Sequence, residues 1–298
     1  MTELQANTPE VKLTIGHMEL RPGVPVYVRI YEPKNFSKTL LCLHGAVGSC
    51  ADFDELAKAF ASDGYRVISY DRPGIGRTPL PDSILKNFVL ANLGILQAFM
   101  KTTGGVDAVI CSSGGAAIFH TFWARLAPKL SLKVPLLVYS EPGFEMSDEV
   151  KASVRSRAEF MAGRYATFEE ARAAWLACGW DQVEFASDAV RDAFLTNRLI
   201  KIDQHYRPAV HEKLLVALRD LKIANSVDAL RVQADFPGPV LLMYAAQRES
   251  HHQARLVDLK RSYPDIRLHS VSGTGHPLSL TTAHEISTIR DFLNHGAA

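Results

Sequence analysis

Short apolar runs alternate with helical segments along most of this chain. Residues 39–45 (TLLCLHG) are nearly all apolar and end at glycine, and similar runs occupy 65–71 and 106–111. A strand that is covered on both faces in a parallel sheet has this character. An amphipathic stretch at 51–64 separates the first two runs. Strands that alternate with helices predict right-handed crossovers and an open, mostly parallel sheet with helices on both faces.

The ends of the chain extend this pattern. Residues 11–20 and 24–33 are rich in β-forming residues and flank an Arg-Pro-Gly turn, which predicts a hairpin at an antiparallel edge of the sheet. Later strands are expected within 134–143, 238–247 and 266–276. A last helix is expected around ISTIRDFL.

Residues 144–235 contain no convincing strand pattern and predict about four helices. Thr167 begins a capping box, Ser187 is a typical N-cap, and Pro208 suits the first turn of a helix. We expect these helices to form a cap over the carboxyl edge of the sheet, where ligands bind in open α/β folds. The predicted division is a core of residues 1–143 and 236–298 and a helical cap of residues 144–235.

Composition narrows the class of partner. The chain has 298 residues, 47% of them hydrophobic, with 33 Lys and Arg against 32 Asp and Glu. This balance and the lack of a basic run argue against nucleic acid and membrane partners and favour a small-molecule substrate. The first residues resemble no secretion signal, and no apolar stretch reaches about 18 residues, so we expect a cytoplasmic protein. Four cysteines without metal-ligand spacing predict no disulfide and no metal site.

Two adjacent serines lie between a buried run and two glycines, in the stretch 109–119 (VICSSGGAAIF). A strand that turns sharply into a helix can present a nucleophile there, provided that the residues two before and two after it are small. Ser113 has Cys111 and Gly115 at these positions, whereas Ser112 would place Ile110 at the crowded one. We therefore favour Ser113 as the nucleophile and keep Ser112 as the alternative.

Residues 42–49 (CLHGAVGS) end the first buried strand. A His-Gly at this point leaves a backbone N–H free to face an active site, and the residue after the nucleophile supplies a second. The backbone amides of Ala46 and Gly114 are thus the predicted oxyanion hole. A nearby loop, 70–78, contains Asp71, for which we expect a structural role in bracing that loop.

A histidine and a carboxylate are needed to complete a catalytic triad. His276 lies in a glycine-rich loop after the last strand, from which it can reach the serine as a general base. Glu249 is the first acid after the preceding strand and is the favoured partner of His276. Glu141, at the tip of an earlier strand, is the alternative.

Taken in order, the motifs LCLHGAVGS, DRPGIGRT, CSSGG and GTGH resemble those of the α/β-hydrolase superfamily over essentially the whole chain, and in particular its capped bacterial esterase-like members. The resemblance implies the α/β-hydrolase fold, a Ser-acid-His triad and no cofactor. Aspartate nucleophiles occur in the dehalogenases and epoxide hydrolases of this superfamily, and this elbow has none.

The expected activity is cofactor-independent hydrolysis of a carboxylic ester, lactone or thioester through an acyl-enzyme. Aromatic residues of the cap suggest a partly apolar substrate: Trp175, Trp180, Phe185 and Phe194. The same triad order also fits a carbon–carbon bond hydrolase, a lyase or a cofactor-free dioxygenase, and the fold also fits a non-catalytic small-molecule receptor. The sequence does not specify the natural substrate or the oligomeric state.

Overall fold

The structure is a computed structural model of the chain. It describes residues 10–21, 23–45, 48–81, 88–133, 135–141, 156–212, 214, 236–246, 256–257, 259–261, 263–275 and 277–296.

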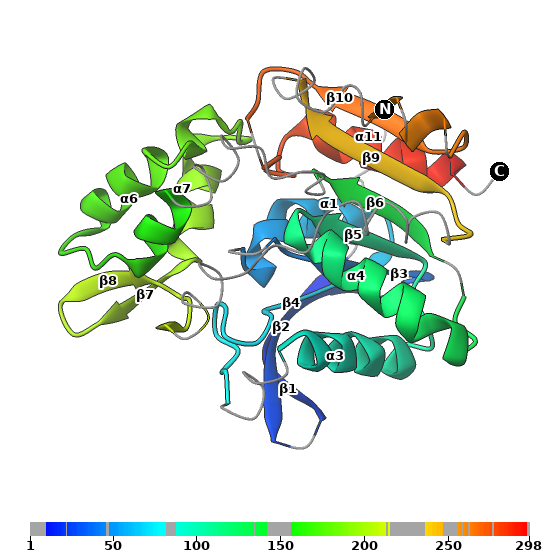
Figure 1. Cartoon of the computed structure of the whole chain (residues 1–298), viewed down its shortest axis with the longest axis horizontal. Coiled ribbons are helices and arrows are strands. Elements are labelled where there is room, and N and C mark those ends of the chain that lie inside the picture. The colour runs from blue at the N-terminus through cyan, green and yellow to red at the C-terminus, as the bar shows by residue number, and fades with distance from the viewer. Residues whose placement is uncertain are drawn as a thin grey trace, which may run out of the picture.

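A single eight-stranded sheet organises the described chain (Figure 1). Its strand order is β1-β2-β4-β3-β5-β6-β9-β10. The β1–β2 hairpin is antiparallel and β2 pairs antiparallel with β4, whereas every later pair is parallel. The strands are β1 (Val11–Arg21), β2 (Val24–Pro33), β3 (Lys38–Leu43), β4 (Tyr65–Tyr70), β5 (Ala108–Ser112), β6 (Leu136–Ser140), β9 (Val240–Ala245) and β10 (Arg267–Val271). The predicted fold class and the antiparallel edge are confirmed.

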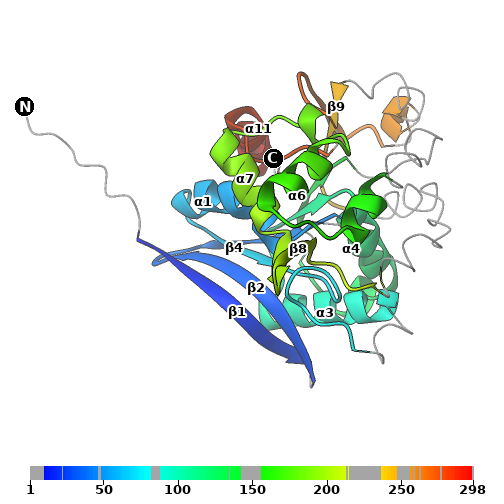
Figure 2. The ribbon, with the colours of Figure 1, turned by 90° about the vertical axis from the view of Figure 1, so that its left-hand side faces the viewer.

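Helices cover both faces of this sheet, as Figure 2 shows from the side. They are α1 (Asp54–Ser62), α3 (Phe88–Thr102), α4 (Gly114–Arg125) and α11 (Ala283–His295), with short 3₁₀ turns η1 (Cys50–Phe53) and η2 (Ala127–Lys129). Side chains of β5 alternate between two cores: Val109 and Cys111 pack with α3 and α4, whereas Ile110 packs with α1 and α11. This double burial explains why the strand is apolar throughout instead of alternating with polar residues.

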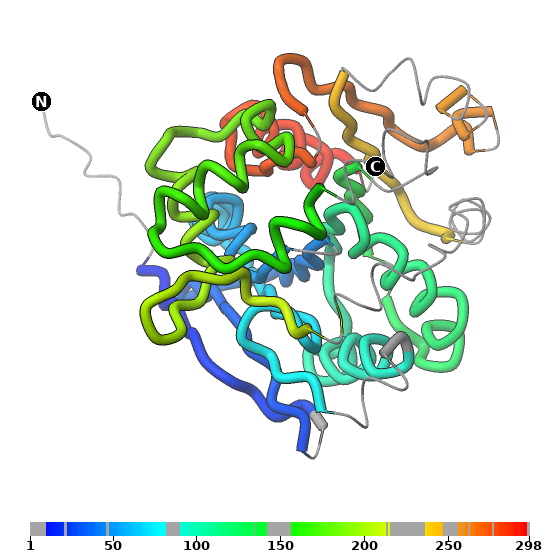
Figure 3. Tube along the Cα trace, turned by 60° about the vertical axis from the view of Figure 1, so that its left-hand side comes forward, coloured from blue at the N-terminus to red at the C-terminus, as the bar shows by residue number. Residues whose placement is uncertain are grey.

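A segment inserted between β6 and β9, described over residues 156–212, lies to one side of the sheet (Figures 1 and 3). It contains α6 (Phe168–Leu176), η3 (Trp180–Gln182), α7 (Asp188–Thr196), β7 (Leu199–Ile202) and β8 (His205–Pro208), besides a helical stretch at 156–162. Its aromatic residues form a separate apolar cluster, in which the rings of Trp175 and Trp180 stack with centroids 4.8 Å apart. We call residues 156–212 the inserted segment.

The expectation of a strandless insertion is wrong at one place. β7 and β8 form an antiparallel hairpin, and Asp203 in its turn has a positive φ of 55°. Pro208, expected in the first turn of a helix, is the last residue of β8. Each strand has only four residues, which is too short for a recognisable alternation of apolar and polar side chains. The predicted caps are confirmed elsewhere: the side chains of Thr167 and Ser187 accept backbone N–H groups at the starts of α6 and α7.

Contacts with loops after the core strands fix the position of the inserted segment. Gly76, after β4, donates its N–H to Ala209, and His211 donates to Gly74. Gly275, after β10, donates to Gln182. Since β4 and β10 are parallel members of one sheet, both loops lie at its carboxyl edge. The segment therefore covers this edge, and its status as a separate domain stays a prediction.

A buried histidine makes the stability of the core depend on pH. His120 of α4 stacks on Tyr139 of β6, and its Nδ1 lies 3.3 Å from the Tyr139 hydroxyl. Burial lowers the pKa of His120 from 6.5 to about 4. Between these pH values the imidazole is neutral in the folded chain and charged in the unfolded one. The free energy of unfolding therefore decreases as the pH falls through this range.

We expect the loss of stability at low pH that His120 causes to disappear when His120 is replaced. When the pH is lowered from about 7 to about 4, the free energy of unfolding should fall in both proteins. The fall should be about 3 kcal/mol smaller in the double variant Tyr139→Phe/His120→Phe than in Tyr139→Phe alone. Urea unfolding at several pH values measures this difference. Equal pH dependence of the two proteins would contradict the role of His120.

Candidate active site

The junction of β5 and α4 has the geometry of a sharp strand-to-helix turn. β5 ends at Ser112, α4 begins at Gly114, and Ser113 lies between them with φ 44° and ψ −115°. A positive φ is unfavourable for a residue with a Cβ, and such strain persists only where the surroundings enforce it. The Ser113 N–H donates to the carbonyl of Ser140 at 2.8 Å. Ser112, in contrast, remains in the strand and pairs with Ser140.

Close approach of the backbones explains the small residues around Ser113. A Cβ on Gly115 would lie 2.3 Å from the carbonyl oxygen of Leu43, at the end of β3. A Cβ on Gly45, in the next loop, would lie 3.4 Å from that of Ser113. On the strand side, Cys111 is fully buried, and burial raises the pKa of its thiol well above the usual range. Cys111 is therefore a packing residue of the elbow.

Replacing Gly115 by alanine tests this steric constraint. We expect Gly115→Ala to lower the free energy of unfolding by about 1–3 kcal/mol, because the β3 carbonyl must move. Alanine is otherwise preferred to glycine inside a helix by about 1 kcal/mol, so a loss would isolate the steric effect. Gly16→Ala is a suitable control, since no atom lies within 4 Å of its added Cβ. Equal or greater stability of Gly115→Ala by urea unfolding would contradict the packing.

The loop after β3 is braced by a buried histidine and a buried arginine. His44 Nδ1 donates to the Gly45 carbonyl at 2.8 Å, and the Arg72 N–H donates to His44 Nε2 at 3.0 Å. The Arg72 guanidinium also donates to the Gly45 carbonyl. Burial, assisted by the charge of Arg72, lowers the pKa of His44 well below its usual range. His44 is thus a neutral, loop-holding residue.

Only part of the predicted oxyanion hole is described. Gly114 occupies the first turn of α4, directly after Ser113. Ala46 lies outside the described residues, although Gly45 next to it packs against the elbow. The pairing of the two amides stays a prediction.

Glu141 lies at the carboxyl tip of β6, beside the elbow. It follows Ser140, the register partner of Ser112, and has a positive φ of 50°. Its N–H donates to Met243 at 2.8 Å, and its Oε1 accepts the N–H of Ala245 at 2.6 Å. Glu141 is only 4% exposed. The structure therefore brings this carboxylate to the same sheet edge as Ser113, whereas Glu249 lies outside the described residues.

His276 also lies outside the described residues, but the loop on both sides of it is described. Gly275 donates its N–H to the Gln182 carbonyl at 2.6 Å. Thr274 Oγ1 accepts the N–H of Glu184 at 3.0 Å, and Thr281 Oγ1 accepts that of Ala186 at 3.1 Å. The loop that carries the predicted base is thus bound to the turn around η3 of the inserted segment.

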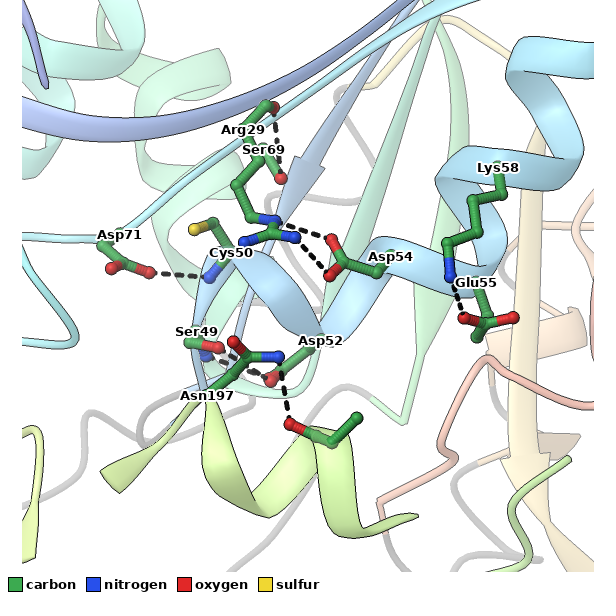
Figure 4. A network of polar contacts seen from close by, with 11 residues as sticks. Arg29, Ser49, Cys50, Asp52, Asp54, Glu55, Lys58, Ser69, Asp71 and Asn197 are labelled. Carbon is green, nitrogen blue, oxygen red and sulfur yellow. Dashed lines mark hydrogen bonds and ion pairs between the residues drawn. The ribbon is translucent and has the colours of Figure 1, made fainter. Parts of the chain in front are cut away.

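Asp71 has the bracing role expected from the sequence, and Figure 4 shows one of its contacts. Its two carboxylate oxygens accept the N–H groups of Cys50 and Arg77 at 2.7 and 2.8 Å. A Cβ on Gly76 would lie 2.0 Å from this carboxylate, so the loop after β4 folds tightly around it.

A buried ion pair that the sequence did not predict joins the inserted segment to η1, the 3₁₀ turn before α1. Arg198 Nη2 lies 2.6 Å from Asp52 Oδ2, and the Asp52 carboxylate also accepts the N–H and hydroxyl of Ser49 (Figure 4 shows the Ser49 contacts). Burial raises the pKa of Asp52 to about 6, although Arg198 acts in the opposite direction. These residues are 146 positions apart, a separation over which sequence patterns carry no pairing signal.

The variant Arg198→Met should leave the Asp52 carboxylate buried without its counter-ion. Breaking a buried pair in this way costs about 3–5 kcal/mol of unfolding free energy. Because the pKa of Asp52 rises further without Arg198, protonation relieves this cost at low pH, so the loss should be larger at about pH 8 than at about pH 5. The exposed pair Lys58–Glu55 is the control, and Lys58→Met should change stability by less than about 1 kcal/mol. A loss at Arg198 that does not vary with pH in urea unfolding would contradict this assignment.

A cavity lies between the loop after β3, at Gly48 and Ser49, and the inserted segment. Its described lining is Gly48, Ser49, Gly76, Arg157, Phe160, Met161, Trp175, Trp180, Arg198, Pro208, Ala209 and Val210. Of the four aromatic residues proposed for substrate contact, Trp175 and Trp180 line it, whereas Phe185 and Phe194 pack beside them. Within the described ranges, no cluster of three or more His, Cys, Asp or Glu side chains is arranged to hold a metal ion. No helix there is long and apolar enough to cross a membrane.

Comparisons with known proteins agree with this architecture. A model described as the Alpha/beta hydrolase family matches residues 40–288. A serine hydrolase-like protein of Dictyostelium discoideum is 25% identical over 129 residues, which cover 42% of this chain and 34% of that protein. The chain thus spans about a third of the length of this curated relative.

Two solved structures are similar over nearly the whole chain. E-2-(acetamidomethylene)succinate hydrolase superposes with a TM-score of 0.73 and 18% identity, covering 95% of this chain and 100% of the other. An esterase from Exiguobacterium antarcticum superposes with a TM-score of 0.67 and 14% identity, covering 94% and 100%. At these identities the likeness is one of fold.

Proposed function

Because the chain belongs to the alpha/beta hydrolase family, we propose that it is a serine hydrolase whose nucleophile is Ser113. The backbone of Ser113 carries this proposal. Ser113 lies between the end of a buried strand and the start of a helix, and its φ is 44°. Strain of this kind at a strand-to-helix turn is characteristic of an exposed nucleophile. Ser112, within the strand, lacks it.

The proposed reaction is acyl transfer to the serine followed by hydrolysis. Ser113 Oγ attacks the carbonyl carbon of an ester, lactone or thioester while His276 takes its proton. The amides of Gly114 and Ala46 stabilise the negative oxygen, and His276 returns the proton to the departing alcohol or thiol. A water molecule then gives a proton to His276 as it attacks the acyl carbon, the bond from that carbon to Ser113 Oγ breaks, and His276 returns the proton to Ser113 Oγ as the acid is released.

Two carboxylates compete to orient His276. Chain order favours Glu249, which follows β9. Position favours Glu141, a buried carboxylate directly after β6, the strand next to β5. The hydrogen bond from Ala245 to Glu141 also fits a purely structural role, in which the carboxylate ties β6 to β9. The kcat values of single variants decide between Glu249 and Glu141 as the partner of His276.

Loss of the nucleophile should abolish hydrolysis of 4-nitrophenyl butyrate. We expect Ser113→Ala to lower kcat by about 10⁴-fold or more, while Ser112→Ala retains turnover within about tenfold. A continuous absorbance assay measures both, with thermal unfolding as a check of folding. Full activity in Ser113→Ala, with loss in Ser112→Ala, would show that the nucleophile is the other serine.

The same assay identifies the triad acid from the kcat values of the two carboxylate variants. If Glu249 orients His276, Glu249→Gln should lower kcat by about 10³-fold or more while Glu141→Gln costs much less. The reverse pattern would assign the acid to Glu141. Because a glutamine amide oxygen still accepts the N–H of Ala245, Glu141→Gln should change the free energy of unfolding by no more than about 1 kcal/mol, and thermal unfolding measured in parallel separates a catalytic loss from a structural one.

A further inference from the structure

Two histidines face each other where β10, an edge strand of the sheet, lies beside α11 (Figure 1). His269 belongs to β10, and His284 belongs to the first turn of α11. Their Nε2 atoms are 3.2 Å apart, and the centroids of the two rings are 5.2 Å apart. Because the centroids are farther apart than the nitrogens, the rings point these nitrogens at each other and do not stack face to face.

This separation matches that of two ligands on one metal ion. Imidazole nitrogen binds Zn²⁺ at about 2.0–2.1 Å, so two such nitrogens lie about 2.9 Å apart at a right angle and about 3.3 Å apart at the tetrahedral angle. The observed 3.2 Å falls between these values. A hydrogen bond between the rings also fits this distance. Since a neutral imidazole can carry its proton on Nδ1 instead, both Nε2 lone pairs can be made available to an ion.

Both rings are open to solvent, and the environment favours the form that binds metals. His284 is exposed, and His269 is half-buried. Burial, followed by the neighbouring imidazole of His284, lowers the pKa of His269. A histidine must be neutral to bind a metal ion, so a lowered pKa reduces competition from protons near pH 7.

The surroundings of the pair leave most of the coordination sphere to water. Among the described residues, no third His, Cys, Asp or Glu joins the two histidines as a ligand. Thr288 Oγ1, one turn along α11 from His284, lies 3.4 Å from His269 Nε2. Arg267, on the same face of β10, donates to the His295 carbonyl at the other end of α11, so its charge is directed away from the pair.

Imidazole ligands restrict the class of ion. They suit Zn²⁺, Cu²⁺ and Ni²⁺, whereas Mg²⁺ and Ca²⁺ prefer oxygen ligands. Among the late ions, a site of this kind binds Cu²⁺ more tightly than Zn²⁺.

The pair also connects the two ends of one loop. β10 ends at Val271 and α11 begins at Ala283, and the residues between them include His276. An ion held by His269 and His284 would therefore link the elements on either side of this loop.

We propose that His269 and His284 form a surface site for a late divalent transition-metal ion, which links β10 to the start of α11. The proposal is independent of the role of Ser113, because it requires only these two side chains.

Chemical footprinting of the full chain locates the site, with Zn²⁺ as the probe ion. Diethyl pyrocarbonate acylates free, neutral imidazole, and mass spectrometry of peptides gives the rate at each histidine. At about pH 7.5 and with Zn²⁺ at about ten times its Kd, modification of both His269 and His284 should slow about tenfold. His205, an exposed histidine of β8, is the internal control and should react at an unchanged rate. Mg²⁺ should protect none of the three.

Single variants test whether the two rings bind the same ion. Loss of a residue that merely supports a metal ligand weakens binding by about 10–100-fold, so loss of a ligand should cost at least about tenfold. In His284→Gln protein, the Zn²⁺ concentration that half-protects His269 should rise by at least this factor, and His269→Gln should do the same at His284. His205→Gln is the matched control and should leave both values unchanged. Thermal unfolding without metal checks that each variant is folded.

Protection of neither histidine by Zn²⁺, or of only one, would overturn the site. Full protection of His269 in a folded His284→Gln protein would show that the two rings do not share an ion. Equal protection by Mg²⁺ would overturn the choice of a late transition metal. Weaker protection by Cu²⁺ than by Zn²⁺ at equal concentration would contradict coordination by imidazole nitrogen.

Discussion

The strained backbone of Ser113 is the constraint on which the rest of the site depends. Its φ of 44° is maintained from both sides: the Ser113 N–H is bound by Ser140 of β6, and Gly115 lets α4 start against the end of β3. The strain is therefore balanced by the packing of three adjacent parallel strands. The same packing brings Gly45 and Glu141 to the two sides of the serine.

The inserted segment contacts the loops that border the candidate site. It binds the loop around Gly275 through η3, and it binds η1 through the pair of Arg198 and Asp52. One turn of this segment thus touches the loop of the proposed base and places Trp180 in the cavity wall. The positions of the loop at Gly275 and of this cavity wall therefore both depend on the inserted segment.

Local patterns predicted the parts of the fold that depend on nearest neighbours. The apolar runs predicted β3 and β5 because both faces of each strand are buried, and the small residues around Ser113 predicted which serine occupies the turn. The β7–β8 hairpin was missed because four residues show too little periodicity. The contact of Arg198 with Asp52 was missed because tertiary packing alone brings them together. The placement of Glu249, His276 and Ala46 stays a prediction.

A covalent probe tests most directly whether the strained turn presents Ser113 as a nucleophile. The native protein is treated with a fluorophosphonate and digested. Tandem mass spectrometry then locates the modified residue. We expect one phosphonate adduct, on Ser113, and none in the Ser113→Ala protein. An adduct on Ser112, or no adduct on a protein that hydrolyses esters, would contradict it.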